Sequence, residues 1–296
     1  PDVSTGMNVL VTGGAGSVGT WVVKRLAEQG HAVTVAGRSE HKDVEGMARY
    51  VALDVTDAAA CVQVVEGHER VIHLAAIPSP GGVPGTTLFN INCDGTYNLL
   101  EACVKCGVDH VAIASSINAL GQKYGVKPWP VHYFPVDEDH PQLHSDPYSL
   151  SKHVTEEIAR YFWHKNGLSS ISLRIPAVMA PGPWSADWMR RERDSGGQGF
   201  ASDFWVMIDS RDSATAFDLA SQPIYEGAHI CFVNDTVNVV GLPSRELAAR
   251  WYGYVTDWRA PVEADEAMVS PDRFRRLTGW EPAYSWRGIA DGAPMP

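Results

Sequence analysis

Hydrophobic positions in the first 175 residues fall into short apolar runs that alternate with longer segments of helical periodicity. A short apolar run bounded by turn signals predicts a buried strand. Six such runs predict strands, at residues 8–12, 31–36, 50–54, 70–74, 110–115 and 170–175. Apolar residues spaced three and four positions apart predict helices between them, at residues 17–29, 57–65, 87–107 and 148–166.

The predicted strands are continuous apolar runs rather than polar–apolar alternations, which is typical of a parallel sheet covered by helices on both faces. Alternating strand and helix units join through right-handed crossovers. The sequence therefore predicts an α/β fold with a doubly wound parallel Rossmann sheet. We expect a dinucleotide-binding domain over residues 7–175 and a smaller C-terminal substrate-binding lobe over residues 176–296.

The second half is less regular, and residues 181–200 show no clear element. Strand candidates follow at residues 205–208 and 229–233, and helix candidates at residues 213–219 and 244–252. We expect part of residues 204–235 to return to the Rossmann sheet.

Composition and charge narrow the class of partner. The formal net charge is −11 at pH 7, whereas binding to nucleic acid needs clustered Lys and Arg, so we expect no nucleic-acid partner. No apolar run reaches the ~18 residues that a membrane helix needs, so we expect no membrane segment. The five cysteines are scattered and odd in number, which is a poor disulfide framework and favours a cytoplasmic protein.

No metal site is expected. Cys103 and Cys106 form a lone CxxC pair without a second Cys or His pair at ligand spacing, which favours two small residues near a helix end over redox or metal chemistry. His132, His140 and His144 lie in a predicted loop, where no regular spacing brings them together.

A glycine-rich loop separates the first predicted strand from the first predicted helix. Gly13, Gly16 and Gly19 follow a GxxGxxG spacing, and Ser17 and Val18 lie among them. Glycines at these positions permit a tight turn, a close approach to a pyrophosphate and close packing of helix on strand. The helix N-terminus then faces the negative charge. The loop predicts a dinucleotide site, with a purely structural turn as the alternative.

The residues after the second predicted strand bear on the choice of cofactor. An acidic residue there binds the ribose hydroxyls of NAD, whereas a nearby Arg accommodates the additional phosphate of NADP. This segment has no acid, and Arg38 can pair with a phosphate. We expect NADP to be preferred, with NAD possible, unless Arg38 is only a solvated loop cation.

Tyr148 and Lys152 form a YxxxK motif at the start of a predicted helix, which places both side chains on one helical face. A lysine ammonium beside a phenol favours the phenolate, so we expect the pKa of Tyr148 to be lowered. Such a tyrosine can exchange a proton with a substrate oxygen while a hydride moves at the adjoining carbon. Its position two strand–helix steps after the glycine loop favours a catalytic pair.

Over nearly all of residues 7–290 the chain resembles the extended short-chain dehydrogenase/reductase family, the NAD-dependent epimerase/dehydratase group, and within it the uronate and aldose dehydrogenase-like members. The residues that carry the resemblance are 12–19 (TGGxGxxG), 53–55, 73–76 (HLAA), 92–96 (NxxGT), 114–116, 174–176, 181–182, 209–212 and 278–280. Besides the glycine loop, Arg38, Tyr148 and Lys152, the resemblance implies cofactor contacts from Asp54, Val55, Leu74, Ala75, Ala76, Asn92 and Ile175.

The resemblance also implies a catalytic serine. In this family the active serine lies five residues before a glycine, and Gly121 therefore points to Ser116. Ser115 is expected on the other side of the strand, because side chains alternate along it. Family members often form homodimers through two long helices, which here are residues 87–107 and 148–166.

One departure from the family concerns the substrate. Nucleotide-sugar members carry an Asn that contacts the nucleotide sugar, and Ala177 stands at the matching position. Ser116, Asn118 and Ala177 are therefore expected to contact a small free substrate, such as a sugar or sugar acid. Trp129, Trp184, Trp188 and Trp205 either stack on this substrate or pack the lobe, and Arg190, Arg191 and Arg193 either bind a carboxylate or are solvated.

Three functions remain open at this point. The first is an NAD(P)-dependent oxidoreductase that interconverts an alcohol and a carbonyl. The second is a nucleotide-sugar epimerase or dehydratase that retains NAD and returns the hydride. The third is a cofactor-sensing protein without enzymatic activity, which the presence of both Tyr148 and Lys152 disfavours.

Overall fold

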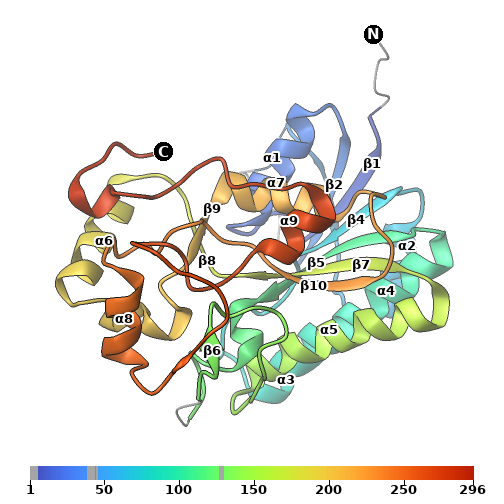
Figure 1. Ribbon diagram of the computed structural model, residues 1–296. Coiled ribbons are helices and arrows are strands. Elements are labelled where there is room, and N and C mark those ends of the chain that lie inside the picture. The colour runs from blue at the N-terminus through green and yellow to red at the C-terminus, as the bar shows by residue number, and fades with distance from the viewer. Residues whose placement is uncertain (1–5, 39–43, 45, 127–129) are drawn as a thin grey trace.

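The computed structural model describes residues 6–38, 44, 46–126 and 130–296 (Figure 1). Within them, seven parallel strands form one sheet in the order β10–β7–β5–β4–β1–β2–β3. These strands are β1 (Asn8–Thr12), β2 (Ala32–Gly37), β3 (Arg49–Ala52), β4 (Arg70–His73), β5 (His110–Ser116), β7 (Ser169–Ile175) and β10 (Ala228–Phe232). The prediction of a doubly wound parallel Rossmann sheet is confirmed.

Helices cover both faces of this sheet, as Figure 1 shows. One face carries α1 (Gly19–Glu28), α7 (Ser210–Ala220) and α9 (Asp272–Thr278), and the other carries α2 (Ala58–Val65), α4 (Gly95–Cys106) and α5 (Pro147–Asn166). Because side chains alternate along β1, this strand contributes to a hydrophobic cluster on each face of the sheet. Val9 and Val11 pack in one cluster, and Leu10 packs in the other. This two-sided burial explains why the strands are continuously apolar.

The helix predicted at residues 87–107 is interrupted. It consists of α3 (Gly85–Phe89), a π-helical turn at Asn90–Asp94, and α4. In the π turn, Oδ1 of the buried Asn92 accepts a hydrogen bond from the backbone N–H of Ile77 at 2.7 Å, and its Nδ2 donates to Ser151 Oγ at 2.9 Å. A π-helical turn holds one more residue than an α-helical turn. Within it, the buried Asn92 links the loop after β4 to α5.

A second group of elements forms a lobe at the carboxyl ends of the strands. It contains β6 (Tyr133–Phe134), β8 (Ala177–Met179), β9 (Met207–Asp209), β11 (Asp257–Trp258), α6 (Pro183–Asp194), α8 (Ser244–Trp251) and the short 3-10 helices Ile117–Leu120, Gln198–Asp203 and Ile289–Asp291. Its core clusters around Phe134, Met189, Trp205 and Trp286. Residues 181–200 were expected to be irregular, but they contain α6, whose charged surface leaves little helical apolar pattern. The domain division after residue 175 stays a prediction.

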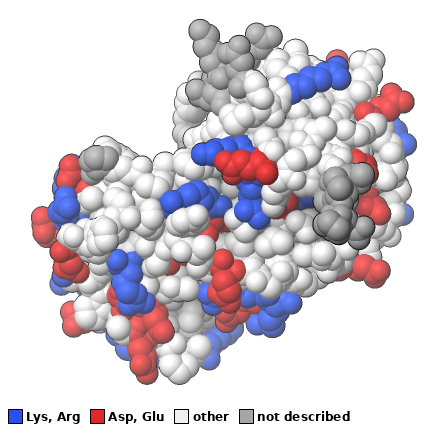
Figure 2. All heavy atoms as spheres, turned by 90° about the horizontal axis from the view of Figure 1, so that it is seen from above, with Lys and Arg blue, Asp and Glu red and all other residues white. Residues whose placement is uncertain are grey.

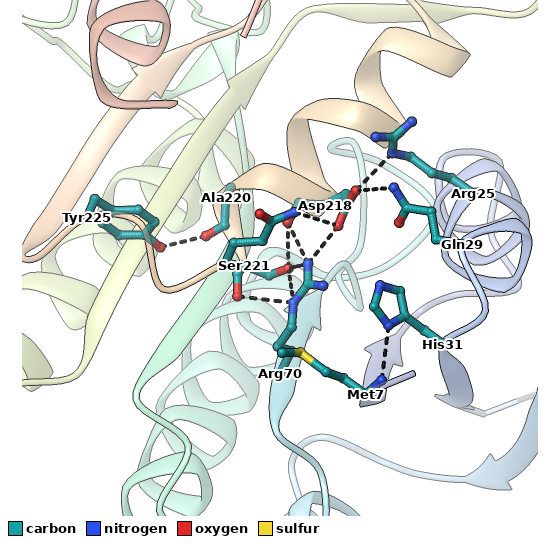
Figure 3. Close-up of polar contacts among 10 residues, drawn as sticks. Met7, Arg25, Gln29, His31, Arg70, Asp218, Ala220, Ser221 and Tyr225 are labelled. Carbon is teal, nitrogen blue, oxygen red and sulfur yellow. Dashed lines mark hydrogen bonds and ion pairs between the residues drawn. The ribbon is translucent and has the colours of Figure 1, made fainter. Parts of the chain in front are cut away.

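A buried ion pair joins the amino end of β4 to α7, and the same carboxylate reaches α1 (Figure 3). Arg70 Nη2 lies 2.7 Å from Asp218 Oδ1, and both side chains are almost fully buried. Arg25 Nε and Gln29 Nε2 each donate to Asp218 Oδ2 at 3.0 Å. A hollow of about 340 Å³, lined partly by His31 and Arg70, lies beside this cluster. The cluster therefore ties three sequence-distant segments together at the end of the sheet opposite the lobe.

Acidic and basic side chains are interspersed on the face shown in Figure 2. Among the helices that the structure describes, none has the combined length and apolar character needed to cross a bilayer.

Candidate active site

A cleft of about 740 Å³ lies at the carboxyl ends of the strands, between the sheet and the lobe. This is the position at which ligands bind in open α/β sheets. We call it the main cleft. Its lining includes most of the residues that the sequence predicts for the site, namely Gly13, Gly16, Ser17, Val18, Gly19, Arg38, Leu74, Ala75, Ala76, Ser116, Asn118, Tyr148, Lys152, Ile175 and Ala177.

Three predicted cofactor residues are absent from the described lining of the main cleft. Asp54 is exposed, and its Oδ1 accepts hydrogen bonds from the backbone N–H and hydroxyl of Thr56. Val55 is buried against Gly95, and Asn92 bonds the loop after β4 as described above. Their assignment to the cofactor stays a prediction.

The glycines let the loop pack closely against neighbouring backbone, because a side chain at these positions would clash with it. Gly13 has φ +69°, and a Cβ there would lie 2.7 Å from the Ala75 backbone nitrogen. A Cβ on Gly19 would lie 2.5 Å from the Gly13 carbonyl oxygen. No side chain caps the start of α1 at Val18. Free N–H groups at a helix N-terminus beside a glycine turn fit the pyrophosphate of a dinucleotide.

Arg38 is exposed on the rim of the main cleft at the end of β2. The positive charge of Arg38 acts on Asp54, which follows the end of the neighbouring strand β3. The hydrogen bonds from Thr56 hold the pKa of Asp54 below its ordinary value, and Arg38 adds to this effect. Arg38 is thus a cation at the position where a ribose substituent is recognised in Rossmann sheets.

Ser116 and Tyr148 meet inside the main cleft. Ser116 ends β5, and Tyr148 lies in the first turn of α5, where Asp146 caps the helix by accepting from the Ser149 N–H at 2.8 Å. Pro147 stands at the first helical position, which suits its fixed φ. The side chains of Ser116 and Tyr148 both line the cleft, and the Ser116 hydroxyl lies near enough to act on the pKa of the Tyr148 phenol. The two hydroxyls are therefore placed to share one substrate oxygen.

Lys152 lies one turn beyond Tyr148 on the same face of α5. Its Nζ donates to the Ala114 carbonyl oxygen at 2.7 Å and lies 5.9 Å from the centre of the Tyr148 ring. Burial lowers the pKa of Lys152 to about 8. Burial also raises the pKa of Tyr148 to about 12, although the nearby Ser116 hydroxyl opposes this. The expected lowering of the Tyr148 pKa is therefore wrong for the protein alone, because burial of the phenol disfavours the charged phenolate.

A buried network beneath these residues was not predicted from the sequence. Ser115 Oγ donates to Glu156 Oε1 at 2.7 Å, and Arg174 donates to both Glu156 oxygens at 2.8 Å. Glu156 and Arg174 are fully buried. Ser115 thus faces this network while Ser116 faces Tyr148, as the alternation predicts. One signal was available: Glu156 follows Lys152 by one helical turn, and Arg174 is a lone charge in an apolar strand.

The lobe side of the main cleft contains two charged residues that the sequence reasoning missed. Lys123 Nζ lies 2.5 Å from Asp203 Oδ2, and both residues line the cleft with Tyr124. The Tyr124 and Tyr148 rings are 5.7 Å apart and meet edge to face. Eighty residues separate Lys123 from Asp203 in the sequence, so only the folded chain brings them together.

Of the tryptophans and arginines proposed for the substrate, those that the structure describes do not line the main cleft. Trp205 is fully buried in the lobe, Trp188 packs against Phe200, and Trp184 is exposed. Trp129 lies outside the described residues. Arg190, Arg191 and Arg193 lie on α6, away from the described lining of the main cleft. Within the described residues, no group of three or more His, Cys, Asp or Glu side chains could hold a metal ion.

The fold and the main cleft define a nicotinamide-dinucleotide enzyme. The profile of the NAD dependent epimerase/dehydratase family matches residues 9–194, and the chain belongs to this family. It is an NAD(P)-dependent enzyme of the extended short-chain dehydrogenase/reductase type.

Individual relatives differ in activity. The chain is 32% identical to an L-arabinose 1-dehydrogenase (NAD(P)(+)) of Haloferax volcanii over 63% of this chain and 71% of that protein. It is 31% identical to a UDP-glucose 4-epimerase of Azospirillum brasilense over 59% of this chain, but only 50% of that protein. The crystal structure of a uronate dehydrogenase from Agrobacterium tumefaciens has the same fold, with a TM-score of 0.68, 19% identity, and coverage of 99% of this chain and 91% of that one.

Proposed function

We propose that this enzyme is a dehydrogenase that interconverts an alcohol and a carbonyl on a small free sugar or related compound. One observation carries the proposal: the pair of Ser116 and Tyr148, with Lys152 beneath it, shares one cleft with the glycine loop. The pair offers a proton carrier at the place where a cofactor held by the loop would meet a substrate.

Each residue of this group has a distinct role in the proposed reaction. In the oxidation direction, Ser116 donates a hydrogen bond to the substrate oxygen, and the Tyr148 phenolate takes its proton. Lys152 holds a positive charge near the phenol, which favours the phenolate. A nicotinamide held by the glycine loop would supply the hydride acceptor, and its positive ring would favour the phenolate further. In the reverse direction the Tyr148 hydroxyl returns the proton.

A free substrate is favoured over a nucleotide sugar by Ala177. This residue lines the main cleft and offers only a methyl group at the position where the family's nucleotide-sugar members carry an Asn. The similarity to an L-arabinose dehydrogenase agrees with a free sugar. The similarity to UDP-glucose 4-epimerases supports the second candidate, an epimerase that retains NAD.

We also propose that NADP is preferred to NAD. Gly37 and Arg38 line the cleft at the end of β2, where an acid that selects NAD would stand. The Arg38 guanidinium is exposed and can form paired hydrogen bonds with a phosphate.

A homodimer built on α4 and α5 is the expected assembly. Tyr161 is 42% exposed on α5, and its ring stacks on that of Tyr97 with centres 6.1 Å apart. Such an exposed aromatic pair is typical of an interface. Sedimentation should give a dimer that Tyr161→Glu dissociates. The cytoplasmic location stays a prediction from the cysteine count.

Absorbance and product analysis separate the two enzymatic candidates. The purified protein is incubated with free sugars and NAD(P)+, and separately with UDP-glucose and catalytic NAD. A net rise in reduced nicotinamide with a free sugar supports the dehydrogenase. Formation of UDP-galactose without any net change in nicotinamide would replace the proposal by the epimerase.

A further inference from the structure

The main cleft holds an ion pair beside the proposed reaction centre. Lys123 Nζ and Asp203 Oδ2 are 2.5 Å apart. Both residues line the cleft together with Ser116 and Tyr148. The Asp203 charge acts on the Tyr148 phenol, which places the carboxylate within electrostatic range of the group that exchanges the proton.

The backbone that presents Asp203 is strained and firmly packed. Asp203 ends the 3-10 helix Gln198–Asp203, and the next two residues, Phe204 and Trp205, have φ of 53° and 55°. Positive φ costs a bulky residue about 1–3 kcal/mol and persists only where packing enforces it. Both side chains are fully buried, and Trp205 Nε1 donates to the Gly197 carbonyl oxygen at 2.7 Å. Asp203 is therefore held in one position.

Lys123 is also held in place. Its Nζ lies 5.5 Å from the centre of the Phe200 ring and 5.9 Å from that of Tyr124, in addition to its bond with Asp203. Contacts of an ammonium with aromatic rings fix its position and lower its need for water. About a third of the Lys123 side chain is exposed, so part of it faces the cleft.

Along the described lining of the main cleft, the lysines near Ser116 and Tyr148 are either buried or paired with a carboxylate. The charged lining residues are Arg38, Lys123, Lys152 and Asp203. Arg38 lies at the end of β2, which is three strands away from β5 in the sheet. Lys152 is buried beneath Tyr148 and donates to the Ala114 carbonyl oxygen, and Asp203 neutralises Lys123.

We propose that the Lys123–Asp203 pair binds adjacent hydroxyl groups of a neutral sugar and discriminates against sugar acids and sugar phosphates. This inference rests on the proposed dehydrogenase function and specifies its substrate class. Asp203 lines the cleft with only 2% of its side chain exposed, and Lys123 bonds to its Oδ2, which leaves Oδ1 as the oxygen offered to a ligand. One sugar hydroxyl donates to this oxygen, and its neighbour accepts from the Lys123 ammonium. A carboxylate or phosphate at the same place finds no uncompensated positive charge, because Asp203 already neutralises Lys123, and it brings a second anion close to the Asp203 carboxylate.

Asp203→Asn is the decisive variant, because it keeps the shape and leaves the Lys123 charge uncompensated. The substrates are matched at one carbon: glucose, glucuronate and glucose 6-phosphate, with galactose, galacturonate and arabinose alongside. For the wild type, kcat/KM should be higher for the neutral sugars. In Asp203→Asn it should fall about 10- to 100-fold for the best neutral sugar and rise for the matching acid. Asp187→Asn, which removes an exposed partner of Arg190 on α6, should change neither value.

Further measurements distinguish this inference from the alternatives. If Asp203→Asn lowers activity equally for neutral and acidic sugars, with a parallel loss of thermal stability, the pair is only structural and the inference is wrong. A wild type that oxidises uronates faster than aldoses also overturns it, while the proposed dehydrogenase function stands. Calorimetry can show that aldoses but not uronates bind to the NADP+ complex. If no oxidation follows this binding, the inference is supported and the proposed dehydrogenase function is wrong. NADP+ affinity should be the same in all variants, which checks folding.

Discussion

The ammonium group of Lys152 donates a hydrogen bond to the carbonyl oxygen of Ala114, 2.7 Å away. Ala114 precedes Ser116 by two residues on β5, so this bond fastens α5 to the strand that carries the serine. One residue nearer Ser116, Ser115 bonds to Glu156 on the same helix. These two connections fix the distance between strand and helix, and with it the geometry in which Ser116 and Tyr148 meet.

Replacement of Tyr148 by Phe should remove the proton carrier while leaving the cleft intact. We expect kcat to fall by about 10²–10⁴-fold, the usual contribution of a positioned acid or base. NADP+ affinity, measured by fluorescence titration, should change little. Tyr124→Phe is the matched control, because this ring lies against Tyr148 in the same cleft and its hydroxyl has no proposed role in proton transfer. Unchanged turnover in Tyr148→Phe would refute the acid–base role.

Arg38→Ala should change cofactor preference. Loss of paired hydrogen bonds to a phosphate should lower kcat/KM for NADP+ by on the order of 10- to 100-fold, with little change for NAD+. Arg49→Ala serves as the control, because Arg49 is exposed at the start of β3 and does not line the described part of the main cleft. An equal loss with both cofactors would contradict an interaction with the additional phosphate.

The pH dependence of oxidation should respond to the charge of Asp203. Burial is the main cause of the raised pKa of Tyr148, and the Asp203 carboxylate contributes in the same direction. Asp203→Asn removes this contribution, so the Tyr148 phenol should ionise at lower pH. The rising limb of log kcat/KM against pH should therefore move to lower pH than in the wild type. Movement to higher pH, or none, would show that Asp203 does not act on Tyr148.

Stability should depend strongly on the buried pair of Arg70 and Asp218. Asp218→Asn leaves the Arg70 guanidinium without its counter-charge, which typically costs about 3–5 kcal/mol. Asp291→Asn removes the exposed partner of Arg193 and should cost about 0–1 kcal/mol. Urea denaturation of the two variants tests this difference. Similar midpoints for both variants would mean that the buried pair adds nothing beyond a surface pair.

Asp218 also makes an acid-sensitive contribution. Burial alone would raise the pKa of Asp218, but its bonds with Arg70, Gln29 and Gln222 hold it below the ordinary value. A carboxyl whose pKa is depressed by folding stabilises the protein above its unfolded pKa, and this stability is lost as the pH falls through the folded value. The wild type should therefore lose stability below about pH 4 more steeply than Asp218→Asn.

Local patterns were sufficient for the sheet and for most residues of the main cleft. β1 is predicted at its observed bounds because an apolar run and a glycine turn delimit it. Helix α6 was missed because its surface is mainly charged. Lys123 with Asp203, and Arg70 with Asp218, could not be predicted: each pair is joined across 80 or more residues, and neither partner has a local signature. Asn92 was predicted to contact the cofactor, whereas its described partners are a backbone loop and Ser151.

The last strand of the sheet has a consequence for how the protein is made. β10 completes the sheet by pairing with β7, although the lobe segment with β8, α6 and β9 is synthesised between them. Until residues 228–232 leave the ribosome, β7 has an open edge with unpaired N–H and C=O groups. Such an edge is a template for pairing with another chain. A nascent chain that stops between β7 and β10 is therefore prone to aggregate rather than to yield a smaller working enzyme.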